Sequence, residues 1–313
     1  MKITGRASGE AVDGACFQAG ETGYGSEMGQ GGEKRDDAEA EAAPYVIAPA
    51  ARPGRFVFAS PHSGTIYPVD MAASPHLDEA GLRSAEDALI DRLIAPGPDQ
   101  GATVIAATVG RAYLDLNRDP QELDPVLIDG VKAGAATLRT SAGYGVVPRL
   151  SGDGHPLYDR RLSRAEADAR IARVHRPYHE VLSQLMQSTQ AREGSAVLID
   201  WHSMPSRVTR TAPGVRGVDV VLGDRHGTAC DPALTRRLKA LFESLGWRVA
   251  LNHPYAGGWT TQVWGRPAEG LHAIQIELNR ALYLDEATRL PGPGWSRCEK
   301  GVARVITALL SED

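Results

Sequence analysis

Short runs of apolar residues, typical of buried strands, recur along the chain from Tyr45 onward. The strands predicted from these runs cover residues 55–60, 102–109, 196–200, 218–222, 247–251 and 273–278. Predicted helices separate them over residues 84–94, 163–190, 231–246 and 296–310. Most of the strands are continuously apolar, which is expected of strands covered on both faces. The pattern therefore predicts an α/β fold with a mixed, largely parallel sheet and helices on both faces.

Two of the predicted helices begin with capping residues. Ser163 is followed three residues later by Glu166, which is the spacing of a capping box. In the helix predicted over residues 84–94, Ser84 is the candidate N-cap and Pro96 follows the end. These signals fix where the two helices are expected to start.

Residues 1–44 differ in composition from the rest of the chain. They are rich in glycine, and a run of charged residues occupies positions 33–37. Such a segment has too little apolar surface to offset the entropy lost on ordering. It also lacks the apolar stretch of a secretory signal peptide. We therefore predict a disordered, glycine-rich tail over residues 1–44, followed by a single domain over residues 45–313.

The composition of the chain limits the kinds of molecule that it is expected to bind. The 313 residues include 34 Lys and Arg and 39 Asp and Glu, so the net charge is −5. With no global basic field, we expect no nucleic-acid partner and no membrane partner, and an anionic substrate needs locally placed arginine or lysine. No apolar run reaches the ~18–20 residues of a transmembrane helix. The three cysteines, Cys16, Cys230 and Cys298, are far apart, which favours reduced thiols and a cytoplasmic location.

Polar clusters follow several of the predicted strands. His62 comes directly after the first strand, and residues 111–120 follow the second. His202 follows the strand that ends at Asp200, and Glu277 lies near the end of the last strand. Because open α/β sheets bind ligands beyond the carboxyl ends of their strands, these side chains are expected to share one site. Two histidines with a carboxylate at such an edge suggest a metallohydrolase.

Several other catalytic patterns are missing from the sequence. It contains no Gly-x-Ser-x-Gly elbow, no P-loop motif and no His-Glu-x-x-His motif. His175 and His179 have a helical metal-ligand spacing, but Pro177 between them is expected to disturb a helix, which favours a packing role. Cys230 and Cys298 have no activating motif beside them.

Five motifs follow one another along the chain: residues 61–64, Glu86-Asp87 with Asp91, residues 111–120, residues 200–203, and the stretch from Gly257 to Glu277. Their order and spacing resemble those of the N-formylglutamate amidohydrolase family, which is related to the zinc carboxypeptidases and aspartoacylases. The resemblance covers most of residues 45–313 and implies one catalytic domain with a phosphorylase/hydrolase-like fold. It further implies release of formate and L-glutamate from N-formyl-L-glutamate by zinc-activated water, with a role in histidine degradation.

The resemblance also implies a set of metal ligands. A catalytic zinc ion takes three protein ligands, two of which would be His62 and His202. The related carboxypeptidases place a glutamate three residues after the first histidine, where this chain has Thr65. The resemblance points instead to Asp87, with Glu86 as its rival.

The predicted helix over residues 84–94 gives the acidic residues a context. It would place Asp87 in the first helical turn, where the helix dipole favours a negative charge. Asp91 would follow one turn later on the same face, as a hydrogen-bond acceptor behind the ligand. The alternative is that Glu86, Asp87 and Asp91 form only a solvated helix start.

Glu277 is the candidate general base. Its neighbours in the last strand are apolar, so its carboxylate must face a polar site or be paired. It would take a proton from water and pass it to the departing nitrogen. The alternative is a structural salt bridge to Arg280 or Arg266.

Three arginines are candidates for binding a substrate carboxylate, because the planar guanidinium fits it. Arg118 is assigned to that carboxylate together with Asn117 and Ser203. Arg111 is assigned to the same group or to the tetrahedral oxyanion. Arg266 is the third candidate.

The sequence leaves several alternatives open for the substrate, the metal and the oligomeric state. The substrate could be another N-acyl amino acid or the end of a short peptide, and a non-catalytic amino-acid binder would keep the fold. The segment from Gly257 to Thr261 could be a lid or a turn that needs a positive φ. The chain could be a monomer or a homodimer, and other divalent metals could replace zinc.

Overall fold

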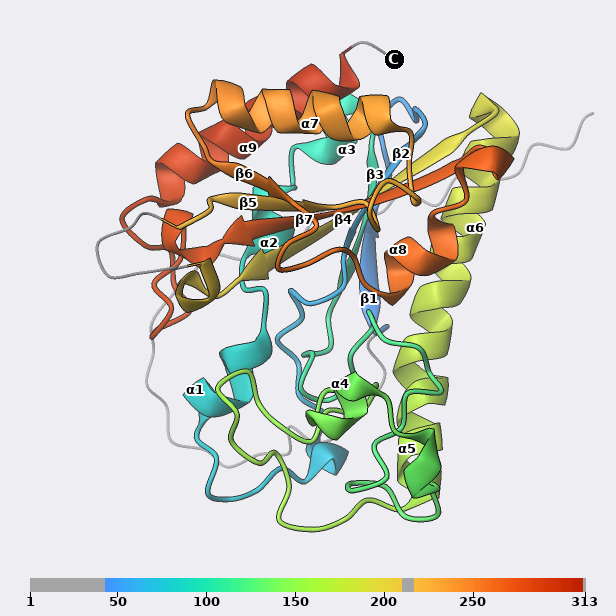
Figure 1. Ribbon diagram of the computed structural model, residues 1–313, viewed down its shortest axis with the longest axis vertical. Coiled ribbons are helices and arrows are strands. Elements are labelled where there is room, and N and C mark those ends of the chain that lie inside the picture. Colours follow the sequence, from blue (N-terminus) through green and yellow to red (C-terminus); the bar gives the residue numbers. More distant parts are fainter. Residues whose placement is uncertain (1–42, 210–216, 312–313) are drawn as a thin grey trace, which may run out of the picture.

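The fold is built on a mixed sheet in the computed structural model, which describes residues 43–209 and 217–311 (Figure 1). Within those ranges the sheet has seven strands in the order β1-β3-β2-β4-β7-β5-β6. Strands β3, β2, β4 and β7 run parallel, whereas β1 pairs antiparallel with β3, and β5 pairs antiparallel with β7 and parallel with β6. The bounds are β1 (Tyr45–Ala48), β2 (Phe56–Ser60), β3 (Thr103–Ala107), β4 (Ala196–Met204), β5 (Val220–Gly223), β6 (Val249–Leu251) and β7 (Leu271–Asn279). The predicted mixed, largely parallel sheet is confirmed.

Helices cover both faces of the sheet, as predicted (Figure 1). Helices α7 (Pro232–Ser244) and α9 (Trp295–Leu310) lie on one face, with the short helices α2 (Ile90–Leu93) and α3 (Gly97–Gln100). Helix α6 (Arg176–Glu193) packs on β4 and β2 from the other face. Successive strand residues point to opposite faces, so Phe58 joins the core beneath α7 and α9 while Val57 joins the core beneath α6.

The predicted capping box at Ser163 is confirmed. The Glu166 backbone N–H donates to Ser163 Oγ at 3.2 Å, and the Ser163 N–H donates to Glu166 Oε2 at 2.8 Å. The cap begins α5 (Arg164–Arg170), which continues through a five-residue π-helix (Ile171–His175) into α6. Pro177 therefore does not break the helix, because the wider π turn lies just before it, and it occupies the first turn of α6.

The helix predicted over residues 84–94 is wrong. Ser84 lies in a short 3₁₀ turn (Arg83–Ala85), where its hydroxyl donates to the Gly81 carbonyl. The chain is extended at Glu86 and left-handed at Leu89, and within the predicted range the α-helix covers α2 alone, residues 90–93. The cause is tertiary: the Asp87 N–H donates to the His62 carbonyl at 2.9 Å, which holds residues 86–89 against the end of β2.

The remaining chain forms a lobe with little regular structure below the sheet (Figure 1). It contains the short helices α1 (Glu79–Leu82) and α4 (Leu138–Ser141). Strand β1 and helix α8 (Trp259–Trp264) are additional elements that the apolar pattern did not predict. Among the described residues, no helix is long and apolar enough to cross a membrane. The predicted tail over residues 1–44 lies outside the described residues apart from positions 43 and 44.

Candidate metal centre and substrate cavity

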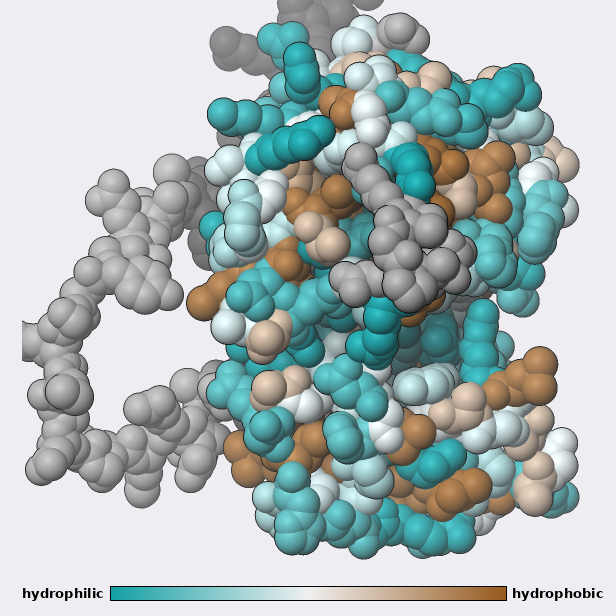
Figure 2. Space-filling view, turned by 60° about the vertical axis from the view of Figure 1, so that its left-hand side comes forward, coloured by the Kyte–Doolittle hydropathy of each residue, from teal (hydrophilic) through white to brown (hydrophobic). Residues whose placement is uncertain are grey.

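A cavity of about 620 Å³ opens at the carboxyl ends of β4 and β7. Its walls come from the sheet edge and from the lobe below, and Figure 2 shows a recess of hydrophilic residues between these two parts. Side chains of five arginines line it: Arg111, Arg118, Arg139, Arg207 and Arg280. The sequence-predicted residues His62, His202, Ser203, Asn117 and Glu277 also line this cavity.

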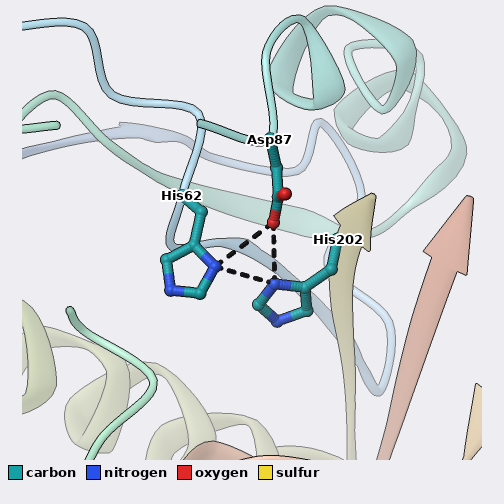
Figure 3. A group of neighbouring side chains, drawn as sticks. All are labelled: His62, Asp87 and His202. Carbon is teal, nitrogen blue, oxygen red and sulfur yellow. Dashed lines mark hydrogen bonds and ion pairs between the residues drawn. The ribbon is translucent and has the colours of Figure 1, made fainter. Parts of the chain in front are cut away.

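His62, Asp87 and His202 converge at the floor of the cavity (Figure 3). They come from the end of β2, from the extended segment before α2, and from β4. The two Nδ1 atoms lie 3.0 Å apart, and Asp87 Oδ2 lies 3.2 Å from Nδ1 of His62 and 3.1 Å from Nδ1 of His202. All three residues are at most 2% exposed. The structure thus brings together the three residues that the resemblance implied as ligands.

This donor set fits a divalent cation. A tetrahedral zinc ion with bonds of about 2.0–2.1 Å separates its ligand atoms by roughly 3.3 Å. The three inward atoms already lie 3.0–3.2 Å apart. Two imidazole nitrogens and a carboxylate oxygen are also ligands that zinc prefers. His62, Asp87 and His202 could therefore hold a metal ion.

The outer nitrogens of both histidines face carboxylates. Nε2 of His62 lies 2.7 Å from Asp115 Oδ1, and Nε2 of His202 lies 3.0 Å from Asp200 Oδ2. When Nε2–H donates to the carboxylate, the Nδ1 lone pair points into the centre. Metal-ligating histidines are commonly oriented in this way. No motif in the sequence marks Asp115 or Asp200 for this role, although Asp200 lies two residues before His202 on the same strand face.

The second oxygen of Asp87 is held by Ser203 and Arg280. Asp87 Oδ1 accepts from Ser203 Oγ and from Arg280 Nη2, each at 3.1 Å. Burial alone would raise the pKa of Asp87, but hydrogen bonds with His202 and His62 hold it well below its usual range. Ser203 therefore supports the candidate ligand Asp87, while its contact with a substrate stays a prediction, since it also lines the cavity. Arg280, which was expected only as a partner of Glu277, takes part in the same support.

Glu86 is turned away from the two histidines. Its carboxylate accepts from Tyr67 Oη at 2.8 Å and from Arg83 Nε at 3.1 Å. Of the two rival ligands, the structure thus places Asp87 at the centre. Asp91 lies in α2, and no hydrogen bond joins it to Asp87 within the described residues, so its expected support of that ligand is wrong.

Glu277 lies beside the centre. It is the register partner of His202 on the neighbouring strand and is 7% exposed. Its Oε1 accepts from Gln275 Nε2 at 2.7 Å, and no ion pair is found for its carboxylate among the described residues. The alternative salt bridge to Arg280 or Arg266 is therefore wrong. Burial raises the pKa of Glu277 to about 7, with the Asp87 charge adding to the rise.

Asn117 joins several elements around the centre. Its Oδ1 accepts from the N–H and the hydroxyl of Thr260, each at 2.9 Å. Its Nδ2 donates to Gln275 Oε1 at 3.3 Å and to Asp200 Oδ2 at 3.4 Å. These contacts use both ends of the amide and give Asn117 a supporting role, while its contact with the substrate carboxylate stays a prediction. A Cβ at Gly258 would lie 2.3 Å from the same amide, which explains the glycine there.

Three arginines crowd one wall of the cavity. Arg111 Nε donates to Asp115 Oδ2 at 3.0 Å, and Arg118 Nε lies 3.7 Å from the same oxygen. Burial lowers the pKa of Arg118, and the positive charges of Arg111 and Arg139 add to the effect. Asp115, the buried carboxylate they share, is also bonded to His62. This wall therefore has an excess of positive charge that a substrate anion would balance.

The third candidate arginine lies elsewhere. Arg266 is 46% exposed, pairs with Glu269 at 2.8 Å and does not line the cavity. Its assignment to the substrate is therefore corrected to a surface ion pair. The two described cysteines are buried, and burial raises the pKa of Cys230 to about 11 and that of Cys298 to about 12. Both are protonated thiols at neutral pH, as expected of inert cysteines.

His175 and His179 hold the segment that carries Asn117. Nε2 of His175 lies 3.0 Å from the Arg118 carbonyl, and Nε2 of His179 lies 2.8 Å from the Leu116 carbonyl. Both rings pack on Trp259. The predicted packing role is therefore confirmed, and α6 positions the wall of the cavity.

The segment from Gly257 to Thr261 has a defined conformation. Gly257 has a φ of 118°, so the expected turn with positive φ is confirmed. Gly258 N–H donates to Gln275 Oε1 at 2.9 Å, and Thr261 Oγ1 donates to the Gly258 carbonyl at 2.9 Å. These bonds tie the segment to β7 and to the start of α8, which favours the turn over the lid.

Comparisons with known proteins agree on one family. A family model described as N-formylglutamate amidohydrolase matches residues 54–284. The chain is 34% identical over 229 residues to an N-formylglutamate deformylase from Pseudomonas aeruginosa and 32% identical over 229 residues to one from Pseudomonas putida. Each alignment covers 72% of this chain and 80% of the relative. A crystal structure of N-formylglutamate amidohydrolase from Ralstonia eutropha JMP134 has a TM-score of 0.80 at 34% identity, covering 87% of this chain and 98% of that one.

Proposed function

Since the chain belongs to the N-formylglutamate amidohydrolase family, we propose that it hydrolyses the formamide of N-formyl-L-glutamate to formate and L-glutamate. The observation that carries the proposal is the convergence of His62, Asp87 and His202 beside a buried Glu277. A centre of this kind is suited to amide hydrolysis, because it joins a cation site to a carboxylate that can carry a proton.

His62, Asp87 and His202 would hold one zinc ion, or another divalent metal in its place. A bound zinc ion would supply a Lewis acid that polarises the formyl carbonyl and makes nearby water more acidic. Asp115 and Asp200 keep the two histidines in the tautomer that this role needs.

Glu277 is the general base of the proposed reaction. It removes a proton from the attacking water and delivers it to the amide nitrogen as the C–N bond breaks. Its burial favours this role, because a pKa of about 7 lets the carboxyl group accept and release a proton near neutral pH. A binder without catalysis has no use for such a carboxyl group.

The arginine wall binds the substrate in this proposal. Arg118 pairs with a carboxylate of the substrate, because a guanidinium can bond both carboxylate oxygens at once. Arg111 shares Asp115 with His62, and it stabilises the oxyanion that forms on the formyl oxygen. The residual positive charge on this wall supports an acidic N-acyl amino acid as the substrate.

The test compares formate or acetate release from N-formyl-L-glutamate, N-formyl-L-aspartate and N-acetyl-L-glutamate. We expect N-formyl-L-glutamate to have the highest kcat/KM. In Glu277→Gln, kcat should fall about 10²- to 10⁴-fold, which is the range for general acid–base catalysis. Wild-type turnover in Glu277→Gln would overturn the mechanism. Preference for acetyl-glutamate would favour the alternative, hydrolysis of another N-acyl amino acid.

A role in histidine degradation, a cytoplasmic location and the monomeric or dimeric state stay predictions from the sequence.

A further inference from the structure

Tyr255 lines the cavity and is not among the residues assigned to the proposed reaction. It lies in the segment between β6 and α8, and its neighbours Pro254, Ala256, Gly257 and Gly258 also line the cavity. The residue is half-buried. Within the described part of the chain, its hydroxyl makes no hydrogen bond to another residue. A phenol placed in a polar cavity without a protein partner is free to bond to a ligand.

The backbone on the N-terminal side of Tyr255 is held firmly. Asn252 is left-handed, with a φ of 59°, and its N–H donates to the Leu222 carbonyl at 2.8 Å. Its side-chain oxygen accepts from the Asp224 N–H at 3.1 Å. These contacts fix where the segment leaves β6.

The C-terminal side of Tyr255 is held in the same way. The Arg225 N–H donates to the Ala256 carbonyl at 2.8 Å, and Gly258 N–H donates to Gln275 Oε1 at 2.9 Å. A Cβ at Gly223 would lie 2.7 Å from the backbone of Ala256, so the segment packs directly on β5. The phenol is therefore presented from a rigid support, which suits a preorganised hydrogen-bond donor.

The contacts of this segment place Tyr255 on the Glu277 side of the cavity. Gly258 N–H donates to Gln275 Oε1, and Gln275 Nε2 donates in turn to Glu277 Oε1. The charges that act on the phenol include those of Glu277, Arg111, Asp87 and Arg280. Burial raises the pKa of Tyr255, and the Glu277 charge raises it further, so the hydroxyl keeps its proton at neutral pH.

We infer that Tyr255 is a catalytic residue whose hydroxyl donates a hydrogen bond to the formyl oxygen as that oxygen becomes the tetrahedral oxyanion. This inference rests on the proposed function. The hydroxyl keeps its proton throughout, and no covalent bond to the tyrosine forms. A neutral donor at this position stabilises the transition state more than the ground state, because the oxygen gains negative charge only during the attack.

The experiment compares Tyr255→Phe with wild type in the zinc-loaded protein, using N-formyl-L-glutamate. We expect kcat to fall about 100-fold, as for other single oxyanion donors, while KM changes by less than about twofold. Tyr45→Phe is the control, because Tyr45 lies on β1 outside the cavity, where its ring packs on Tyr178. That variant should keep wild-type kcat.

A second measurement separates a lost donor from a disturbed fold. For a tetrahedral phosphinyl analogue of the substrate, the affinity should be lower in Tyr255→Phe than in wild type by about the same factor as kcat/KM. The product L-glutamate should bind both proteins equally. Equal kcat in wild type and Tyr255→Phe, a change in KM alone, or equal weakening of analogue and product would overturn the inference. If the wild-type protein releases no formate, the proposed function itself fails.

Discussion

Nε2 of His62 lies 2.7 Å from Oδ1 of Asp115, and the other oxygen of Asp115 accepts from Arg111. One buried carboxylate thus links a candidate metal ligand to the arginine wall of the cavity. The same carboxylate caps the turn that carries Asn117, through a 2.9 Å bond from the Asn117 N–H. The orientation of the metal site and the position of the substrate-binding wall are therefore coupled through Asp115.

Replacing Asp115 should weaken metal binding. In Asp115→Asn, a neutral amide faces Nε2 of His62, so the imidazole is held less firmly and is a poorer ligand. We expect zinc affinity to fall about 10- to 100-fold, the usual effect of losing such a supporting carboxylate. Competition with a chromophoric chelator measures the change. Asp168→Asn, on the exposed face of α5, is the control and should bind zinc like wild type. An unchanged zinc affinity in Asp115→Asn would contradict the assigned orientation of His62.

The role of Arg118 in binding the substrate carboxylate can be tested by comparison with an arginine on the surface. Arg118→Ala should raise KM for N-formyl-L-glutamate about 10- to 100-fold, because a hydrogen bond between charged groups contributes about 1.5–3 kcal/mol. Arg266→Ala removes an arginine that pairs with Glu269 outside the cavity and should leave KM unchanged. Steady-state kinetics on both variants test the assignment. It fails if the two variants behave alike.

Gly258 should tolerate no side chain. Its φ of −96° is open to any residue, but a Cβ would lie 2.3 Å from the amide of Asn117. We expect Gly258→Ala to lower the free energy of unfolding by about 1–3 kcal/mol, the cost of overpacking a buried site. Gly134→Ala is the control, because Gly134 is exposed and has no atom within 4 Å of the added Cβ. Urea unfolding compares the two, and equal stability would show that the Asn117 contacts are not rigid.

The capping box at Glu166 predicts a pH dependence of stability. Arg160 and the Ser163 backbone hold the pKa of Glu166 at about 2 in the folded protein, against about 4.3 in an unfolded chain. Its ionised form therefore stabilises the fold above about pH 4.3, and this contribution is lost as the pH falls toward about 2. Glu166→Gln keeps the cap but removes the charge, so it should cost less than about 1 kcal/mol near neutral pH.

The measurement for Glu166 is urea unfolding near pH 7 and near pH 3. The difference between wild type and Glu166→Gln should shrink at the lower pH. Glu180→Gln is the control, because Glu180 is exposed on α6 and no ion pair is found for it in the described residues. A difference that grows on acidification would show that the sign of the effect is wrong.

The sheet could be predicted because burial on both faces requires continuous apolar runs. Strands β2, β3, β4, β5, β6 and β7 all lie within or across such runs. The short edge strand β1 is mostly exposed, so its residues carry no such pattern. Helix α8 follows two glycines and has no side-chain cap, so the sequence carries no signal for its start. The break at residues 86–89 could not be predicted, because it depends on the His62 carbonyl from another part of the fold.

The candidate metal ligands could be predicted through the resemblance, whereas the residues that support them could not. His62 and Asp115 are 53 residues apart, and Asp87 and Arg280 are 193 residues apart. Whether a given acid or arginine supports a ligand or binds a substrate depends on such distant contacts. For the same reason Ser203 and Asn117, which lie in the expected motifs, support other residues, and Arg266 forms a surface ion pair.

Deformylation should require a divalent ion held by His62, Asp87 and His202. The most direct test is formate release from N-formyl-L-glutamate by metal-stripped protein, with and without added zinc, in wild type and in His202→Ala. We expect no release without metal, restored release when one equivalent of zinc binds the wild type, and neither tight binding nor release in His202→Ala. Full release by the metal-stripped protein would show that no metal ion is needed.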